Sequence, residues 1–300
     1  MKITEFIDKL IATTLRGDRY KNRLRVTKEL IIKFNKNLKV SDFTEHTTEN
    51  FVEFLRQHPK KYRPNTIRCK FQILQTILNK ASREFKIDSG YQSIIVKGEA
   101  PETIALSEKE IKAIIDVKRL SPKAEVVRDY FVLMCYTGLR FSDTINLRSP
   151  NIIGTNIVVR TQKTNYIVEI PIHPVVRNIL EKYKYKLPQS PSQQSFGLTL
   201  RRICLKANLT KPITVEKTRG ERLYKRVYSL YELITPHTGR RTFATNLYFA
   251  SQPENIPLYR IMLLTGHTTQ ESFFKYIRIQ KSDNARFMSD KSFFKPRPQN

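Results

Sequence analysis

Tryptophan is absent from this sequence of 300 residues, and cysteine is scarce, with only Cys69, Cys135 and Cys204. The three cysteines are odd in number, lie far apart and form no C-x-x-C pair. Cys135 ends the apolar run of residues 131–135, so we expect it to be a buried core thiol and not a ligand or a nucleophile. No structural disulfide is expected, which suits a reducing cytosol.

Long apolar runs are also missing. None approaches the roughly 20 residues that span a bilayer, and the N-terminal stretch MKITEFIDKL lacks the apolar region of a signal peptide. We therefore expect a cytoplasmic protein, neither secreted nor integral to a membrane. No Walker motif, GxSxG motif or His/Cys/carboxylate metal cluster occurs in the sequence.

Acidic residues are few relative to basic ones. The sequence has 27 Asp+Glu against 54 Lys+Arg, a net charge of +27 and a pI near 10.1. Residues 1–100 carry +10 of this charge, which leaves +17 for residues 101–300. A large positive charge indicates a polyanionic partner, with nucleic acid as the first candidate and a membrane surface as the second. Because both halves are basic, we expect both to face the same polyanion.

The first hundred residues carry helical patterns. An apolar pattern runs over residues 3–38 with an interruption near Gly17. Residues 96–106 contain Gly98 and Pro101 and show no periodicity, which is typical of a linker. The predicted organisation is a helical domain over 1–95, a linker over 96–106 and a second domain over 107–300.

The clearest helix begins after Pro64, a residue that suits a first turn. Apolar residues recur from Ile67 to Phe85 at spacings of four and three. A polar row lies beside them and consists of Arg68, Gln72, Gln75 and Asn79. These side chains can bind phosphates and base edges, which predicts a DNA contact, although a solvated helix face would look the same.

The second domain combines helices with short β-rich runs. A capping box starts at Ser107, and an apolar helix over 124–136 stops at Gly138. Two hairpins are expected, one turning at 162–165 and the other at 219–220. The other expected helices cover 174–185, 194–207, 235–250, 258–264 and 269–277. The predicted fold class is mainly α with a small antiparallel β-sheet.

Several residues that can bind anions or react lie at the ends of these helices. Arg140 lies beside the N-terminus of a helix that starts near residue 142, where backbone N–H groups also favour phosphate. His237 and Arg240 share one face of a first helical turn, and an anion between them would relieve their repulsion. His267 lies between two helices, and Tyr276 follows nine residues later. Taken singly, each also fits a structural role.

The order and spacing of these residues are specific together. The TGLR box, a Lys-Thr pair at a hairpin tip, the HTGR box, Gly266-His267 and the tyrosine nine residues later resemble the tyrosine recombinase (phage integrase) family. The resemblance covers 107–279, and the stretch PNTIRCKFQILQTILNKA looks like the core-binding domain of that family. It implies a two-domain member without an arm-binding domain. One departure is Thr265, where many members have a leucine or another apolar residue.

The resemblance implies a role for each site residue. Tyr276 would be the nucleophile that attacks the scissile phosphodiester, leaving a 3′-phosphotyrosyl link and a free 5′-hydroxyl. The other implied members are Arg140, Arg240 and His267 around the non-bridging oxygens, His237 as the general base, Lys163 as the general acid and Asp143 as an orienting carboxylate. Because the phosphotyrosine conserves the bond energy, neither ATP nor a metal nor another cofactor is expected.

The resemblance also implies the partners. These are double-stranded DNA with specific recombination sites and a homo-tetramer in which a C-terminal helix over 282–294 docks on a neighbouring protomer. Residues 201–230 hold nine basic and two acidic residues, which suits an extra DNA contact. The expected contacts there are Arg201, Arg202 and Arg219. The reaction would serve integration, excision or inversion at the bacterial nucleoid. A type IB topoisomerase-like enzyme and a non-catalytic DNA-binding protein of the same fold are the alternatives.

Overall fold

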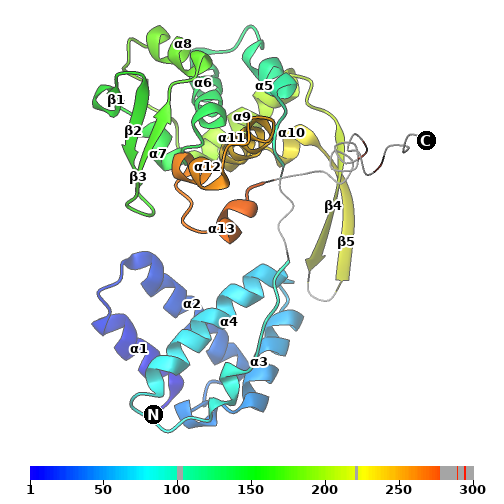
Figure 1. Cartoon of the computed structure of the whole chain (residues 1–300). Coiled ribbons are helices and arrows are strands. Elements are labelled where there is room, and N and C mark those ends of the chain that lie inside the picture. Colours follow the sequence, from blue (N-terminus) through cyan, green and yellow to red (C-terminus); the bar gives the residue numbers. More distant parts are fainter. Residues whose placement is uncertain (100–103, 220–221, 278–288, 290–293, 295–300) are drawn as a thin grey trace, which may run out of the picture. The chain divides into compact units, whose positions relative to one another are not determined.

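A computed structural model describes residues 1–99, 104–219, 222–277, 289 and 294 of the chain (Figure 1). The chain divides into two compact units, one formed by residues 1–102 with 214–226 and the other by 103–213 with 227–300. The expected fold class is confirmed, with two small sheets where one was predicted. In the described residues, no helix is long and apolar enough to cross a membrane.

The first unit contains a group of helices, drawn from blue to cyan in Figure 1. They are α1 (Ile3–Thr13), α2 (Asp18–Asn35), α3 (Glu45–Gln57) and α4 (Pro64–Ala81), with the 3₁₀ turns η1 (Val40–Asp42) and η2 (Ser89–Gln92). Gly17 is the N-cap of α2 and so separates it from α1, at the predicted interruption. Thr44 caps α3 by accepting the backbone N–H of Thr47. The predicted apolar stripe of α4 faces the core of this unit.

Helix α4 is shorter than its apolar stripe. It ends at Ala81, and the N–H of Phe85 still donates to the carbonyl of Ala81. The Phe85 ring then meets that of Phe6 edge-on, with 6.0 Å between the ring centroids. The stripe thus correctly identified a residue that packs against the core, but it overestimated the length of the helix.

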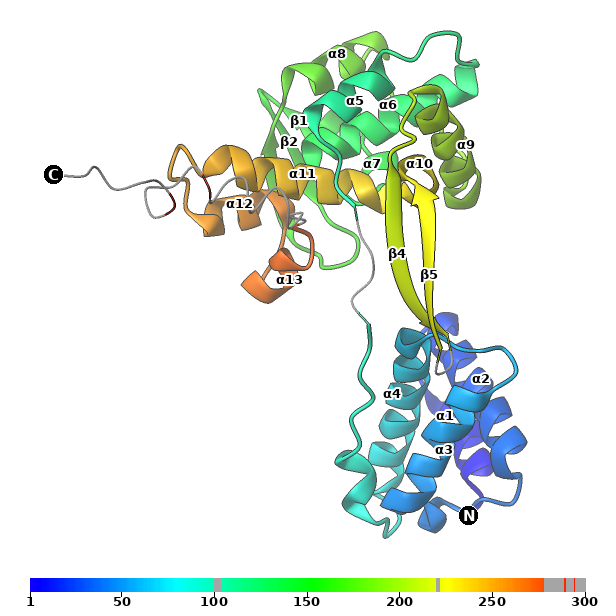
Figure 2. The ribbon, with the colours of Figure 1, turned by 90° about the vertical axis from the view of Figure 1, so that its right-hand side faces the viewer.

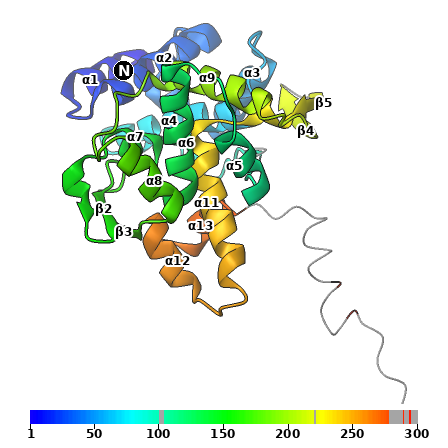
Figure 3. The same ribbon diagram turned by 90° about the horizontal axis from the view of Figure 1, so that it is seen from above.

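The second unit is built around α6 (Pro122–Thr137), which has buried residues all around its circumference. Helix α11 (Pro236–Ser251) runs alongside it (Figure 3), and a Cβ added at Gly239 would lie only 2.8 Å from the Cβ of Met134. Glycine therefore permits the close approach of these two helices. The other helices are α5 (Glu108–Ile115), α7 (Phe141–Ile145), α8 (Pro174–Lys182), α9 (Gln193–Lys206), α10 (Leu230–Leu233), α12 (Leu258–Thr265) and α13 (Gln270–Phe274), with the 3₁₀ turn η3 (Ser149–Asn151).

A three-stranded antiparallel sheet packs on this helical core. Its order is β1 (Ile152–Ile153), β2 (Asn156–Arg160) and β3 (Ile167–Pro171), with Val159 opposite Val168. Alternate residues of β2 and β3 are buried, which fits the expected hairpin. The short strand β1 was not predicted, because two residues carry no detectable alternation.

The second hairpin consists of β4 (Pro212–Arg219) and β5 (Arg222–Ser229), which run side by side (Figure 2). Its expected turn includes Gly220, which lies outside the described residues. The carboxylate of Glu99 accepts the backbone N–H of Thr218 at 3.0 and 3.3 Å. Residues 214–226 accordingly group with the first unit, whereas the sequence placed them in the second domain.

The C-terminal helices form a separate small core. Its buried members are Ala244, Ile261, Phe273 and Ile277. Helix α13 ends at Phe274, earlier than the expected residue 277, so Tyr276 lies just beyond the helix. The predicted C-terminal helix over 282–294 lies outside the described residues, apart from Ser289 and Phe294.

Candidate active site

Arg140 is positioned by the sharp turn between α6 and α7. Gly138 ends α6 with φ +66°, a left-handed conformation that favours glycine, and a Cβ there would lie 2.3 Å from the Phe243 ring. Arg140 is then the N-cap of α7. Its Nη1 is buried and has no hydrogen-bond partner among the described residues. A buried guanidinium N–H of this kind is suited to an anion.

Asp143 connects α7 to the hairpin that carries Lys163. This residue is 3% exposed, and its Oδ1 accepts the backbone N–H of Gln162 at 3.0 Å. Asn165, with φ +54°, closes the turn and donates its N–H to the carbonyl of Thr161. Lys163 is exposed at this tip. Asp143 therefore holds the base of a loop whose tip presents an ammonium group.

Arg240 is the most buried cation of the site, at 2% exposure. Its Nη1 donates to the carbonyl of Gly138 at 2.7 Å, and its Nη2 donates to the carbonyl of Thr265. Its Nε has no partner among the described residues. Burial and the charge of Arg140 lower the pKa of Arg240 to about 10, so the group stays charged at neutral pH. Two carbonyls thus fix the guanidinium while Nε remains available.

His267 lies between Arg240 and the end of α12. Its Nε2 is 3.3 Å from Nη2 of Arg240, and its Nδ1 is 2.7 Å from Oγ1 of Thr265. Burial lowers the pKa of His267 to about 3, and the charges of Arg240 and Arg140 act in the same direction. The imidazole is therefore neutral at physiological pH.

His237 lies in the first turn of α11, directly after Pro236. Burial lowers its pKa to about 4, with further lowering by Arg241, Arg240 and other nearby cations. His237 is consequently neutral at pH 7 and has a lone pair with which to accept a proton.

Tyr276 lies where these groups meet. Its ring centroid is 4.6 Å from that of His267, 5.2 Å from that of His237 and 5.3 Å from Cζ of Arg240. Its backbone carbonyl accepts the hydroxyl of Thr245 at 3.4 Å, which ties it to α11. The structure thus brings the sequence-predicted tyrosine, both histidines and the second arginine together from three separate segments. Among the residues that the structure describes, no partner there forms a hydrogen bond with the Lys163 side chain, but its charge contributes to the lowered pKa of His237.

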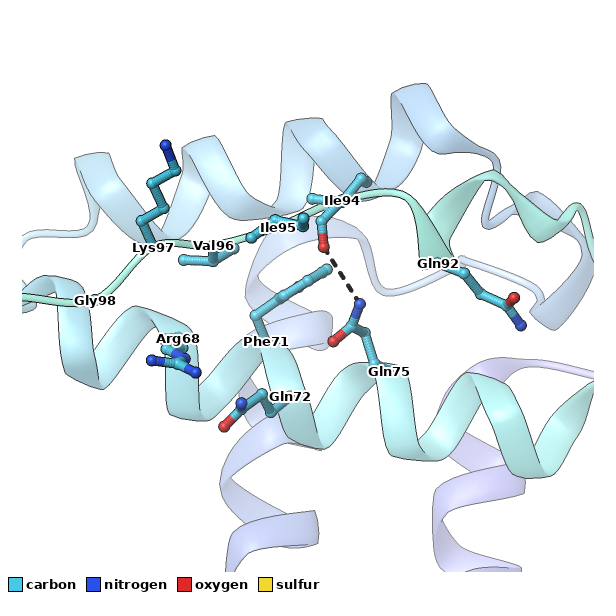
Figure 4. Close-up of a pocket in the computed structure, with 10 residues that line it drawn as sticks. All are labelled: Arg68, Phe71, Gln72, Gln75, Gln92, Ile94, Ile95, Val96, Lys97 and Gly98. Carbon is cyan, nitrogen blue, oxygen red and sulfur yellow. Dashed lines mark hydrogen bonds between the residues drawn. The ribbon is translucent and has the colours of Figure 1, made fainter. Parts of the chain in front are cut away.

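The four side chains of the polar row of α4 have different contacts, and Figure 4 shows three of them, Arg68, Gln72 and Gln75. Nε2 of Gln75 donates to the carbonyls of Tyr91 and Ile94, both at 3.4 Å, and Oδ1 of Asn79 accepts the Tyr91 hydroxyl at 2.8 Å. These two side chains fasten the following segment to the helix. Arg68 and Gln72 are exposed, and together with Gln75 they line an open groove of about 530 Å³. The DNA-contact prediction is therefore better suited to Arg68 and Gln72 than to the other pair.

The three basic residues predicted to contact DNA elsewhere are all exposed. Arg201 and Arg202 lie on α9, and Arg219 ends β4. Nε of Arg201 donates to the carbonyl of Ile234 at 3.4 Å, so part of its guanidinium already has a structural contact.

Two contributors to the site were not assigned by sequence reasoning. They are the carbonyl of Gly138 and the side chain of Thr265, which bind Arg240 and His267 respectively. The only sequence signal was the polar character of Thr265 at a position where the resemblance leads us to expect an apolar residue. Within the described residues, no group of three or more His, Cys, Asp or Glu could hold a metal ion.

Comparisons with known proteins point to one family. The phage integrase family model matches residues 105–283, and the phage integrase SAM-like domain matches residues 2–94. A lambda integrase dimer bound to a COC′ core site is similar in fold, with a TM-score of 0.69 and 16% identity over 95% of this chain and 97% of that chain. The Tn1549 transposon integrase in complex with a circular intermediate DNA is also similar in fold. Its TM-score is 0.71, with 14% identity over 97% of this chain and 99% of that chain.

A lambda integrase tetramer bound to a Holliday junction is also similar, with a TM-score of 0.61 and 14% identity over 89% of this chain and 76% of that chain. A comparison with curated proteins finds no match. At such identities the structural neighbours show the fold, while the family model covers more than half of the chain. The chain therefore belongs to the phage integrase family and is a tyrosine site-specific recombinase.

Proposed function

We propose that Tyr276 attacks a scissile phosphodiester in double-stranded DNA and forms a 3′-phosphotyrosyl bond. The tyrosine O–P bond forms as the bond from phosphorus to the 5′-oxygen breaks, and a second 5′-hydroxyl later reverses the step to rejoin strands. The observation that carries this proposal is the position of the Tyr276 ring, which contacts two neutral histidines and Arg240. The 3′ end of the broken strand would thus stay covalently bound to the protein until the strands are rejoined.

Two arginines would bind the non-bridging oxygens of this phosphate. Nη1 of Arg140 and Nε of Arg240 are buried donors that have no partner among the described residues, and both belong to the same site. Negative charge grows on those oxygens in the transition state. Each preorganised donor is worth about 10²–10³ in rate where measured in comparable sites.

The two proton transfers would be shared between His237 and Lys163. His237 would accept the phenolic proton of Tyr276, whose ring it already contacts. Cations contribute to the low pKa of His237, and a bound phosphate would offset them and raise that pKa toward the range of an effective base. Lys163, at the tip held by Asp143, would donate a proton to the departing 5′-oxygen.

The proposed partner is DNA that carries specific recombination sites, and the proposed assembly is a homo-tetramer with exchange of C-terminal helices. The net charge of +27 supports the partner, and a structural neighbour, the lambda integrase on a Holliday junction, is a tetramer, which supports the proposed number of subunits. We also propose that the protein acts on a mobile element by integration, excision or inversion, in the cytoplasm at the nucleoid.

A suicide substrate tests the nucleophile directly. A nicked duplex that loses its 5′-hydroxyl fragment should trap wild-type protein as a covalent adduct, and Tyr276→Phe should bind the duplex but form none. Tyr259→Phe is the matched control, because Tyr259 is an exposed tyrosine on α12 at 58% exposure. An adduct formed by Tyr276→Phe, or one mapped to another tyrosine, would contradict the assignment. Relaxation of supercoiled DNA without paired sites would indicate a topoisomerase instead.

A further inference from the structure

Thr265 ends α12 and contacts both neighbours of the proposed nucleophile. It is 1% exposed, and it precedes Gly266, whose φ of +63° turns the chain toward His267. Its carbonyl accepts Nη2 of Arg240, and its hydroxyl lies 2.7 Å from Nδ1 of His267. One residue therefore contacts the arginine through its backbone and the histidine through its side chain.

The protons of this cluster can be assigned from its donors and acceptors. A guanidinium only donates hydrogen bonds, so Nε2 of His267, at 3.3 Å from Arg240, must be the acceptor. The proton of the neutral imidazole is then on Nδ1 and is donated to Oγ1 of Thr265. The hydroxyl proton goes to the carbonyl of Ile261 at 3.1 Å or of Met262 at 3.2 Å. In this series of hydrogen bonds, every donor faces an acceptor.

The other tautomer would disrupt two of these contacts. A proton on Nε2 would face the N–H of Arg240, and Nδ1 would present a lone pair to Thr265. The hydroxyl of Thr265 would have to turn away from the α12 carbonyls to satisfy that lone pair. Hydrogen bonding thus favours one tautomer on both sides of the ring.

We propose that Thr265 is a positioning residue that holds His267 in the Nδ1–H tautomer, so that Nε2 and the Thr265 carbonyl together orient the guanidinium of Arg240. A leucine at this position would keep the carbonyl but lose the hydroxyl. The catalytic importance of this arrangement rests on the proposed function, whereas the tautomer itself does not. The guanidinium is held on Nη1 by Gly138 and on Nη2 by Thr265 and His267, and Nε stays available for phosphate.

Nitrogen NMR of protein labelled at its histidine rings tests the tautomer without DNA. The chain has five histidines, and His267→Gln identifies the signal of His267 by its disappearance. The wild type and Thr265→Ser should show a protonated Nδ1 and an unprotonated Nε2. Thr265→Val, which has nearly the same shape but no hydroxyl, should show a mixture of tautomers, because Nδ1 loses its acceptor while the N–H of Arg240 still faces Nε2. A protonated Nε2 in the wild type would overturn the proposal, and this measurement needs no variant of Thr265 to fold.

Suicide-substrate cleavage tests the consequence for catalysis. Thr265→Val should cleave at least about tenfold more slowly than the wild type, as expected for loss of a buried hydrogen bond to an oriented group, and Thr265→Ser should recover most of the rate. Thr242→Val is the matched control, since Thr242 is a buried threonine of α11 whose hydroxyl accepts the N–H of Leu106. It should change stability but not the His267 signals.

Wild-type cleavage by Thr265→Val with an unchanged tautomer would refute the positioning role. If the proposed function fails, the wild type itself forms no adduct, while the NMR result stands. The two failures are therefore distinguishable.

Discussion

Arg240→Lys keeps a positive charge at the centre of the site but removes the planar group that carries it. The arginine donates to the carbonyls of Gly138 and Thr265 and contacts His267, with Nε still available. A lysine ammonium is a compact donor on a flexible stem and cannot make these contacts together. The substitution therefore separates the effect of charge from the effect of fixed geometry.

Two losses of different size are expected from Arg240→Lys. Loss of one preorganised donor to the phosphate should slow cleavage by about 10²–10³, or roughly 2.7–4 kcal/mol of transition-state stabilisation. A buried carbonyl left without its donor should cost about 1–3 kcal/mol of folding free energy, and each kcal/mol lowers Tm by roughly 2–4 °C in a domain of this size. DNA affinity should fall far less, because one phosphate contact among many is changed.

Single-turnover cleavage of a nicked duplex, gel-shift titration and thermal unfolding measure the three quantities. Arg260→Lys is the matched control, since Arg260 is an exposed arginine of α12 whose Cζ lies 5.8 Å from the Tyr259 ring centroid. It should leave cleavage and Tm unchanged. Wild-type cleavage by Arg240→Lys, or losses of rate and affinity of equal size, would refute the view that geometry and not charge is needed at this position.

Three other perturbations test separate parts of the structure. Because burial lowers the pKa of His237 to about 4, the unfolded chain binds a proton that the folded chain does not between about pH 4 and 6.5. The free energy of unfolding in urea should therefore fall as the pH is lowered through that window, with His237 contributing up to about 1.4 kcal/mol per pH unit. His237→Asn should reduce the slope by that contribution, while His267, with a pKa near 3, keeps its own. Asp143→Ala removes the acceptor of the Gln162 N–H. Hydrogen exchange at that amide should therefore accelerate, and the cleavage rate should drop about tenfold. Unchanged exchange would show that Asp143 does not hold the loop that carries Lys163. Gln75→Ala should destabilise the first unit by about 1 kcal/mol and spare DNA affinity; Arg68→Ala should weaken binding and reduce its salt slope by about one, and the reverse pattern would restore Gln75 as a DNA contact.

Local sequence patterns predicted most of the fold, because buried faces repeat at three and four residues in helices and strands are rich in β-forming residues. It found α4 from its apolar stripe and the two hairpins from their β-rich runs. Ends were less accurate, as Phe85 packs against the core after α4 has ended and α13 ends at Phe274. Helix ends depend on capping and on what packs nearby, which periodicity does not record.

Side-chain partners could not be predicted in the same way. The row that contains Gln75 and Asn79 was correctly placed on one face, but the sequence did not reveal that the segment over 91–94 covers part of that face. Similarly, the order of boxes indicated the residues of the site, while the Thr265–His267 contact depends on how α12 ends. These contacts are set by tertiary packing and by hydrogen-bond direction.

The hydrogen bond between Glu99 and Thr218 has a consequence for synthesis of the chain. Its two residues are 119 positions apart, so at about 5–20 residues per second the acceptor leaves the ribosome roughly 6–24 s before its donor. Residues 1–99 have their own buried core, and every buried residue of that core has been synthesised before this interval begins. The hairpin then joins a preformed surface, and the first unit is completed only after much of the second has been translated. A contact of such long sequence separation forms late in folding, so the N-terminal helices pack against one another before this contact is available to them.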